Sequence, residues 1–294
     1  MFQGIYTALI TPFDKEGKVD FASLEKLLIA QLAAGVDGFV FLGTTGEAAT
    51  LTSPERQKVL SFCCEKVHGK AKIIIGAGTN CTATTLELVR QAQTFHPDGV
   101  LIVNPYYNKP NPAGLAEHYR QVAKIGLPIV MYHIPGRTGL KLPATVLEKV
   151  LHEVPQIKAI KESDYDMTHV TDTAVKYAGK IDYICGNDDL FPQYLALNAS
   201  GIISAAANIF APAFVKIYNL FKQGQTQKSF QVFASIYPLI KACYLETNPT
   251  CVKYILSRLG FCTSAVRLPL GEISPENKAK IETLLTHTDS TLRI

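Results

Sequence analysis

Short apolar runs alternate with longer amphipathic stretches from residue 4 to about residue 224. Eight such runs occur, and each is too short for a helix but long enough for a strand. Most are rich in Ile and Val, which is typical of strands that are buried on both faces. The predicted strands are Ile5–Thr11, Gly38–Leu42, Lys72–Gly76, Gly99–Val103, Pro128–Tyr132, Lys158–Lys161, Asp182–Cys185 and Gly201–Ser204.

The stretches between these runs carry helix signals. Apolar residues recur at helical spacing in the first of them, at Phe21, Leu24, Leu27, Leu28 and Leu32. In the second, Thr52-Ser53-Pro54-Glu55 supplies a cap, a proline for the first turn and an early acid, and Asn111-Pro112 repeats the cap and the proline.

Strands that alternate with helices pair in parallel, and eight such units predict a closed (β/α)8 barrel, also called a TIM barrel. A doubly wound open sheet is the alternative. That fold normally carries a glycine-rich ligand loop after its first strand, and no G-x-G-x-x-G occurs in this chain. The barrel is therefore the favoured fold.

The strand pattern stops at about residue 225. Three further helices are predicted there, over Ser229–Leu245, Pro249–Leu259 and Pro275–Leu285. We therefore expect a catalytic barrel over residues 1–224 and a C-terminal helical domain over residues 225–294.

Composition narrows the class of protein. The 294 residues are 47% hydrophobic with a formal net charge of +4, and the basic residues are scattered, so neither a nucleic acid nor a membrane is an expected partner. The seven cysteines show no C-x-x-C spacing, which fits free thiols in a reducing cytoplasm rather than a zinc site or a redox site. No apolar run approaches the roughly 18 residues of a membrane span.

Active sites of such barrels lie at the C-terminal ends of the strands. Gly43-Thr44-Thr45-Gly46-Glu47 follows the second strand, where two glycines allow backbone N–H groups to turn toward an anion such as a carboxylate. A plain glycine turn is the other interpretation. Asn104–Pro110 follows the fourth strand and holds two tyrosines stiffly between prolines, either for a site or for packing.

The fifth strand ends in Tyr132-His133-Ile134-Pro135-Gly136-Arg137. Tyr132 lies at the strand end, and Arg137 lies in a glycine-rich loop where a guanidinium can bind a carboxylate. His133 is open to a catalytic role, although a lone histidine is more often a hydrogen-bonded structural residue.

The sixth strand carries two lysines, Lys158 and Lys161, which an odd spacing places on opposite faces. One of them must face the barrel interior, where burial favours the neutral amine that attacks a carbonyl. Lys161 is nearer the catalytic end and is the candidate nucleophile. A surface lysine remains the alternative from the residues alone.

Taken together, these segments resemble the dihydrodipicolinate synthase branch of the pyruvate-dependent class I aldolase superfamily, which also contains N-acetylneuraminate lyase. The segments GTTGE, PYYNKP, YHIPGRTG and IKES come in the order and at the spacing of that family. The resemblance extends from Gly4 to Arg267-Leu268-Pro269-Leu270, which is nearly the whole chain.

The resemblance implies a role for each matching residue. Lys161 would form a Schiff base with pyruvate, and Tyr132 would be the acid/base tyrosine above the imine. Thr44 and Thr45 would grip the pyruvate carboxylate and relay protons. The remaining matches are Tyr107, which would enter a neighbouring subunit's site, Arg137, which would bind the carboxylate of the second substrate, and Gly186 and Ile203, whose backbones would line the pocket.

The implied reaction condenses pyruvate with L-aspartate 4-semialdehyde to give 4-hydroxy-tetrahydrodipicolinate, on the route to diaminopimelate and lysine. The imine nitrogen accepts electrons, so no metal or organic cofactor is implied. The resemblance further implies a homotetramer built as a dimer of dimers.

Some residues depart from the family pattern. His133 stands where Asn is usual, and His-Ile-Pro is reminiscent of sialic-acid lyases, but those generally show GSTGE and lack the arginine found at Arg137. Another lyase of the superfamily and a non-catalytic binding barrel are therefore the alternatives. In the expected lysine-binding cleft, Arg56 and Thr84 replace the His and Glu of strongly inhibited members, while Asn80 and Tyr106 remain, so we expect weak or absent inhibition by lysine.

Overall fold

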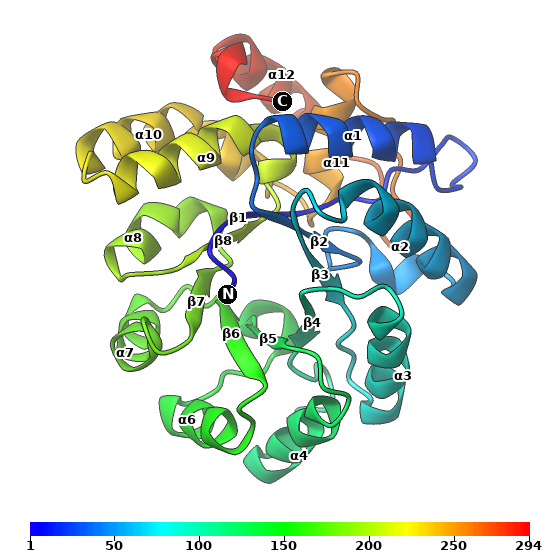
Figure 1. Ribbon diagram of the computed structural model, residues 1–294. Helices are drawn as coiled ribbons and strands as arrows, with labels where there is room; N and C mark the ends of the chain where they lie inside the picture. Colours follow the sequence, from blue (N-terminus) through cyan, green and yellow to red (C-terminus); the bar gives the residue numbers. More distant parts are fainter. The chain divides into compact units, whose positions relative to one another are not determined.

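In the computed structural model, which describes residues 1–294, eight parallel strands close into a barrel in chain order (Figure 1). The (β/α)8 prediction is confirmed, and the doubly wound sheet is wrong. All eight predicted strands are present, and four of them have the predicted bounds. The strands are β1 (Gly4–Ala8), β2 (Gly38–Phe41), β3 (Lys72–Gly76), β4 (Gly99–Val103), β5 (Ile129–His133), β6 (Ile157–Glu162), β7 (Asp182–Cys185) and β8 (Gly201–Ser204).

Helices follow the strands, and three more helices follow at the C-terminal end of the chain. The helices are α1 (Phe21–Ala33), α2 (Ser53–Val67), α3 (Thr82–Gln93), α4 (Pro112–Ala123), α5 (Pro135–Thr138), α6 (Ala144–Glu153), α7 (Met167–Tyr177), α8 (Phe191–Ala196), α9 (Ala207–Lys222), α10 (Thr226–Ala242), α11 (Thr250–Arg258) and α12 (Pro275–Thr286), with short 3₁₀ turns η1 (Ala48–Thr50), η2 (Asp188–Leu190) and η3 (Ser290–Leu292). The three predicted C-terminal helices correspond to α10, α11 and α12. None of the helices combines the length and the apolar character that a membrane span requires.

The predicted helix starts are confirmed in atomic detail. Thr52 caps α2 through a reciprocal capping box, in which its side chain accepts from the Glu55 N–H and Glu55 accepts from the Thr52 N–H. Asn111 accepts from the Gly114 N–H at 2.8 Å, and Pro112 occupies the first turn of α4. Polar caps in the loops after β2 and β4 thus fix where α2 and α4 begin.

The first strand is shorter than its apolar run. It ends at Ala8, although Thr11 was the predicted end. The Leu9 N–H still donates to the Val40 carbonyl, but the Ile10 N–H donates to the Asn208 side chain at 3.1 Å, and Pro12 has no N–H. A side chain from α9 therefore replaces the neighbouring strand as hydrogen-bond partner.

The chain divides into two compact units: Met1–Gln3 with Ile73–Ile203, and Gly4–Lys72 with Ser204–Ile294. In the first unit, β4 pairs with β5, β5 with β6 and β6 with β7, all in parallel. In the second, β1 pairs with β2, and α9 packs against β1 and α10. The boundary proposed at residue 224 falls in the turn between α9 and α10, and a separate C-terminal domain stays a prediction.

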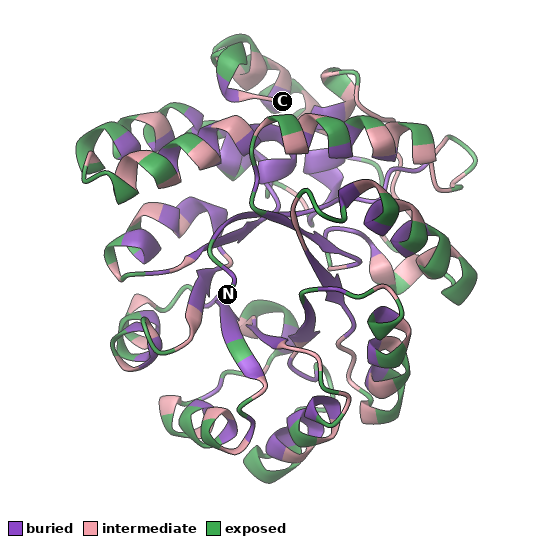
Figure 2. Cartoon of the chain, in the orientation of Figure 1, coloured by how far each residue is buried: buried purple, intermediate pink, exposed green.

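Burial follows the pattern that predicted the elements. Most residues of the strands are buried, with Lys158 on β6 an exposed exception, whereas exposed residues gather on the outer sides of the helices (Figure 2). In α1, for example, Leu24, Leu27 and Leu28 are each at most 1% exposed.

All seven cysteines are free thiols, and we expect Cys81 to react first with iodoacetamide. Cys81 is exposed, and hydrogen bonds from the Thr84 backbone and side chain lower the pKa of its thiol. Burial instead raises the pKa of Cys64 and of Cys262 to about 12. One pKa unit changes the thiolate fraction about tenfold, so Cys81 should label at least about tenfold faster than the others near pH 8. Peptide mapping after brief labelling checks this, and equal labelling of Cys262 would contradict it.

Candidate active site

Lys161 and Tyr132 lie side by side on neighbouring strands. The register of β5 and β6 pairs Tyr132 with Lys161, and the Lys161 Nζ lies 4.2 Å from the centre of the Tyr132 ring. Lys161 is only 7% exposed, whereas Lys158 on the same strand is exposed. The predicted division of the two lysines between opposite faces is confirmed. A buried primary amine beside a phenol is the pair that imine chemistry requires.

Gly186 packs directly against this lysine. Its N–H donates to the Glu162 carbonyl at 2.8 Å, just beyond the end of β7. A Cβ at this position would lie 3.0 Å from the Lys161 Cε and 2.0 Å from the Ser163 Oγ. Gly186 therefore leaves the room that the Lys161 side chain occupies. Ser163 itself is buried, and its Oγ has no hydrogen-bond partner.

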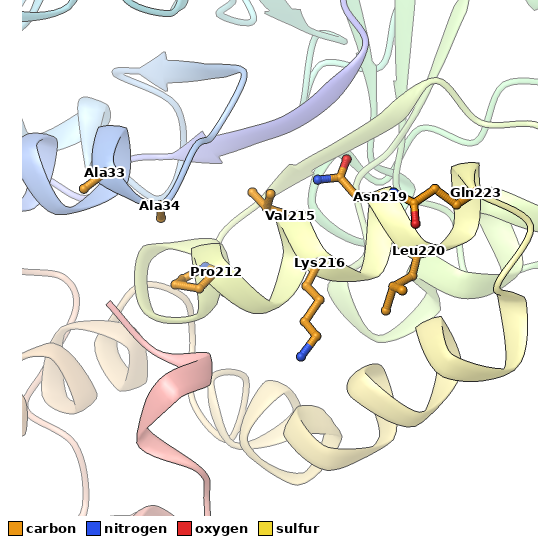
Figure 3. Close-up of a pocket in the computed structure, with 8 residues that line it drawn as sticks. All are labelled: Ala33, Ala34, Pro212, Val215, Lys216, Asn219, Leu220 and Gln223. Carbon is orange, nitrogen blue, oxygen red and sulfur yellow. The ribbon is translucent and has the colours of Figure 1, made fainter.

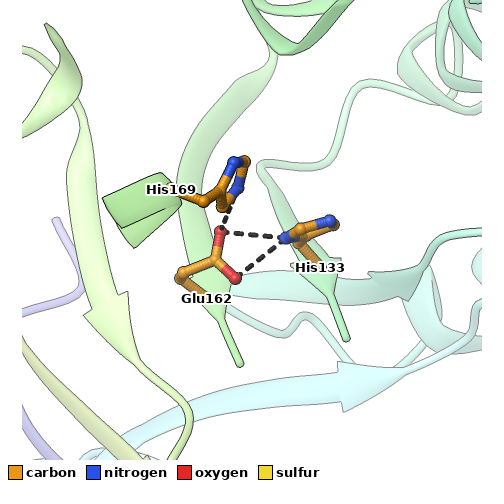
Figure 4. A group of neighbouring side chains, drawn as sticks. All are labelled: His133, Glu162 and His169. Atoms are coloured by element: carbon orange, nitrogen blue, oxygen red, sulfur yellow. Dashed lines mark hydrogen bonds and ion pairs between the residues drawn. The ribbon is translucent and has the colours of Figure 1, made fainter. Parts of the chain in front are cut away.

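A second group of polar side chains lies on the opposite face of the same two strands (Figure 4). His133 and Glu162 are the next residues along β5 and β6, they pair in register, and both are almost fully buried. The His133 Nδ1 lies 2.8 and 3.0 Å from the two Glu162 carboxylate oxygens. From α7, the His169 Nε2 approaches the same carboxylate to 3.6 Å. Burial favours a higher pKa for Glu162, but the interactions with His133 and His169 outweigh it and hold the pKa below its ordinary value.

Replacing His169 by Gln is expected to change how thermal stability depends on pH. The Glu162 carboxylate raises the pKa of His169, against the opposing effect of burial. A histidine with a raised folded-state pKa stabilises the fold fully below its unfolded pKa of about 6.5 and loses that contribution as the pH rises through the folded value. The Tm of the unmodified protein should therefore fall from about pH 6.5 upward, and His169→Gln should flatten that decline. Parallel Tm profiles in calorimetry would contradict this.

The remaining predicted residues of the first unit occupy different surroundings. Ile203 on β8 is buried. Arg137 is exposed and belongs to the single turn α5, directly after β5. Tyr107 is 90% exposed and has a positive φ of 70°, in the loop between β4 and α4. The structure thus brings Lys161, Tyr132 and Gly186 into direct proximity within this unit and leaves Tyr107 projecting from it.

Thr44 and Thr45 follow β2 in the second unit. Thr44 is exposed, whereas Thr45 is buried and its Oγ1 accepts from the Asn248 Nδ2 at 2.9 Å. A hydroxyl has one proton to donate, and accepting from Asn248 leaves that proton available for another acceptor. Thr45 is therefore set up as a donor, which is what binding a carboxylate requires.

Sequence patterns did not identify Asn248, Glu162 or His169 as site residues. Asn248 lies in the segment between α10 and α11, far along the chain from Thr45, and no local pattern relates the two. Glu162 shares a face of β6 with the exposed Lys158, so the strand pattern alone did not predict its burial. In the structure, His169 from α7 lies against its carboxylate.

The second unit also carries an open groove of about 510 Å³ (Figure 3). It is lined by the end of α1 and one side of α9, namely Ala33, Ala34, Pro212, Val215, Lys216, Asn219, Leu220 and Gln223. None of these residues is a predicted site residue, and Lys216 is the one charged side chain among them.

Comparison with known proteins places this (β/α)8 chain in a family. The profile of the dihydrodipicolinate synthetase family matches residues 1–288. A relative from Methanocaldococcus jannaschii, named 4-hydroxy-tetrahydrodipicolinate synthase, is 39% identical over 97% of this chain and 98% of its own. The chain belongs to the dihydrodipicolinate synthetase family.

Solved structures agree with this assignment. The 4-hydroxy-tetrahydrodipicolinate synthase from Methylacidiphilum fumariolicum superposes with a TM-score of 0.95 at 34% identity, covering 99% of this chain and 97% of that one. A protein described as the first monomeric dihydrodipicolinate synthase variant superposes with a TM-score of 0.94 at 37% identity, covering the same shares of the two chains.

Proposed function

We propose that this chain condenses pyruvate with L-aspartate 4-semialdehyde to give 4-hydroxy-tetrahydrodipicolinate, the entry to diaminopimelate and lysine. The family and the names of its relatives support this reaction. The observation that carries the proposal is the buried Lys161 amine beside the Tyr132 ring and against Gly186.

In the proposed mechanism, the Lys161 amine adds to the keto carbon of pyruvate, and loss of water gives an imine. The protonated imine nitrogen accepts electrons, so removal of a methyl proton leaves a neutral enamine rather than a carbanion. The enamine carbon then forms the new bond to the aldehyde carbon, whose oxygen takes up a proton. The amino nitrogen of the semialdehyde finally adds to the imine carbon and displaces the Lys161 amine, which closes the ring and regenerates the enzyme. Tyr132 carries protons in these steps, which are typically worth about 10²–10⁴ in rate.

Three further roles belong to the proposal. Thr44 and Thr45 donate hydrogen bonds to the pyruvate carboxylate, and the Asn248 contact supports the donor role of Thr45. Arg137 binds the carboxylate of the semialdehyde through its guanidinium. The backbones of Gly186 and Ile203 line the pocket. No metal or organic cofactor takes part, and we place the enzyme in the cytoplasm, where its seven free thiols stay reduced.

Borohydride reduction in the presence of pyruvate tests the function directly. Reduction of the imine should add to the protein the mass of pyruvate minus water plus two hydrogens, and peptide mapping should locate it at Lys161. Turnover with pyruvate and the semialdehyde should follow. Absence of an adduct would favour a non-catalytic barrel, and release of pyruvate from N-acetylneuraminate would favour the other lyase.

We also propose that the active form is a homotetramer in which Tyr107 of one copy completes the site of another. An aromatic side chain that is 90% exposed on a backbone of positive φ supports an insertion into a partner. Tyr107→Phe should lower kcat about 10²-fold or more without changing the sedimentation coefficient, because it removes one hydroxyl and keeps the ring. Since one relative is described as monomeric, sedimentation of the active enzyme is the decisive control. A fully active monomer would overturn this arrangement.

A further inference from the structure

The buried group behind the Lys161–Tyr132 pair has a protonation pattern that the contacts determine. The His133 Nε2 accepts the Leu142 backbone N–H at 3.2 Å. A backbone N–H can only donate, so Nε2 must hold a lone pair. The proton of the neutral imidazole is then on Nδ1, and it is donated to the Glu162 carboxylate. His133 is thus a neutral donor with both ring nitrogens satisfied.

The same pattern argues against a metal ion at this place. His133, Glu162 and His169 offer three ligand atoms within 4.8 Å of one another, which is a possible ligand set. A metal would need the lone pair of the His133 Nδ1, and the Leu142 N–H prevents the proton from moving to Nε2. The separation of 2.8 Å between Nδ1 and the carboxylate oxygen also fits an N–H···O hydrogen bond.

The hydrogen bond between His133 and Glu162 connects β5 and β6 one residue beyond the pair Tyr132 and Lys161. His133 follows Tyr132 on β5, Glu162 follows Lys161 on β6, and both pairs are in register. Glu162 also accepts the Asp164 N–H at 2.8 Å, so its carboxylate is held from both sides. Any sliding of β5 along β6 would break the His133 bond and would change the distance between the Tyr132 ring and the Lys161 amine.

We propose that His133 is a positioning residue, which acts through Glu162 to hold the end of β5 against β6 and thereby sets Tyr132 against Lys161. The inference rests on the proposed function, because it assigns a purpose to the placement of the imine-forming lysine. A displacement of about 1 Å in a reacting group costs about 10²-fold in rate. The effect of losing the bond should therefore fall on kcat and on the rate of imine formation.

Two substitutions at one position separate this role from general stability. In His133→Asn the amide nitrogen stands where Nδ1 stood and can still donate to Glu162, but the Leu142 N–H loses its acceptor. In His133→Gln the longer side chain places its amide near the former Nε2, so it can serve Leu142 but not Glu162 in the same way. Each variant removes one of the two buried hydrogen bonds. Because the bond to the Glu162 carboxylate is charge-assisted, His133→Gln should lower Tm more than His133→Asn.

The measurements are kcat and the rate of borohydride-trappable imine formation with pyruvate, at a temperature where circular dichroism shows every variant folded. We expect His133→Asn to keep kcat within about threefold and His133→Gln to lose about tenfold to 10²-fold in both rates. Equal kcat losses in the two variants, or a Tm change with kcat unaltered in both, would overturn the positioning role. Failure of the unmodified protein to trap pyruvate would instead overturn the proposed function.

Discussion

Replacing Lys161 by Ala is expected to lower turnover by a factor on the order of 10³ or more and to abolish borohydride trapping of pyruvate. The Lys161 Nζ is the one protein atom that becomes covalently bonded to substrate in this mechanism, so no neighbouring group can take over its role. The side chain is buried, and Ala leaves a cavity beside Gly186, so a loss of Tm is expected as well. Steady-state turnover and intact mass after reduction are the measurements.

Lys158→Ala is the matched control for that experiment. Lys158 lies on the same strand, three residues earlier, but its side chain is exposed on the other face. Its loss should leave both turnover and trapping unchanged and should alter stability by at most about 0.5 kcal/mol. Trapping that persists in Lys161→Ala and disappears in Lys158→Ala would reject the assignment of the nucleophile.

Alternation along the sixth strand explains how a buried lysine could be predicted, whereas the roles of Thr44, Thr45, Tyr107, Gly186 and Ile203 came from the resemblance to the family. A strand places successive side chains on opposite faces, so the odd spacing predicted that one of Lys158 and Lys161 faces the interior. Lys161 became the candidate because it lies nearer the C-terminal end of the strand, and a surface lysine remained the alternative from the residues alone. The eight strands could also be predicted, because most strands that are buried on both faces are apolar runs. Thr52 and Asn111 likewise marked the starts of the helices α2 and α4. These are local signals, which is why all eight strands were found, although only four have the predicted bounds.

The contacts that support the site are not local, and the sequence did not reveal them. His133 meets Glu162 and His169 only because β5, β6 and α7 come together in three dimensions. A distant contact also explains why β1 is shorter than predicted. The Ile10 N–H, which was expected to bond to the neighbouring strand, donates instead to the Asn208 side chain of α9. A pattern along the chain predicts which residues are buried, whereas the partner of a buried polar group depends on the packing of distant elements.

A further buried pair in the second unit leads to the largest expected change in stability. Lys253 on α11 forms an ion pair with Glu47, and both side chains are at most 1% exposed. The Lys253 Nζ also donates to the Ala265 carbonyl at 2.9 Å and lies 3.9 Å from the centre of the Phe13 ring. Glu47 accepts the Arg267 N–H at 2.9 Å and follows directly after Thr44-Thr45-Gly46.

Lys253→Met should lower the free energy of unfolding by about 3–5 kcal/mol, because it leaves the Glu47 carboxylate buried without a cation. For a chain of this size each kcal/mol corresponds to roughly 2–4 °C, so Tm should fall by about 10 °C. The double variant Lys253→Met, Glu47→Gln removes the unpaired buried charge of Glu47 and should recover most of the lost free energy of unfolding. Arg258→Met on the same helix breaks an exposed ion pair with Glu282 and should cost only about 0–1 kcal/mol.

The same substitution should also affect pyruvate binding at temperatures where the variant is folded. Glu47 has a positive φ of 51° and its N–H donates to the Thr44 carbonyl, so the ion pair holds the turn that carries Thr44 and Thr45. Loosening that turn misplaces the two hydroxyls, and we expect a rise in KM for pyruvate of about tenfold, larger than any change in kcat.

The double variant decides the cause of the stability loss. A double variant that is as unstable as Lys253→Met would show that the uncompensated Glu47 carboxylate is not the cause, because the loss would then come from packing around Phe13.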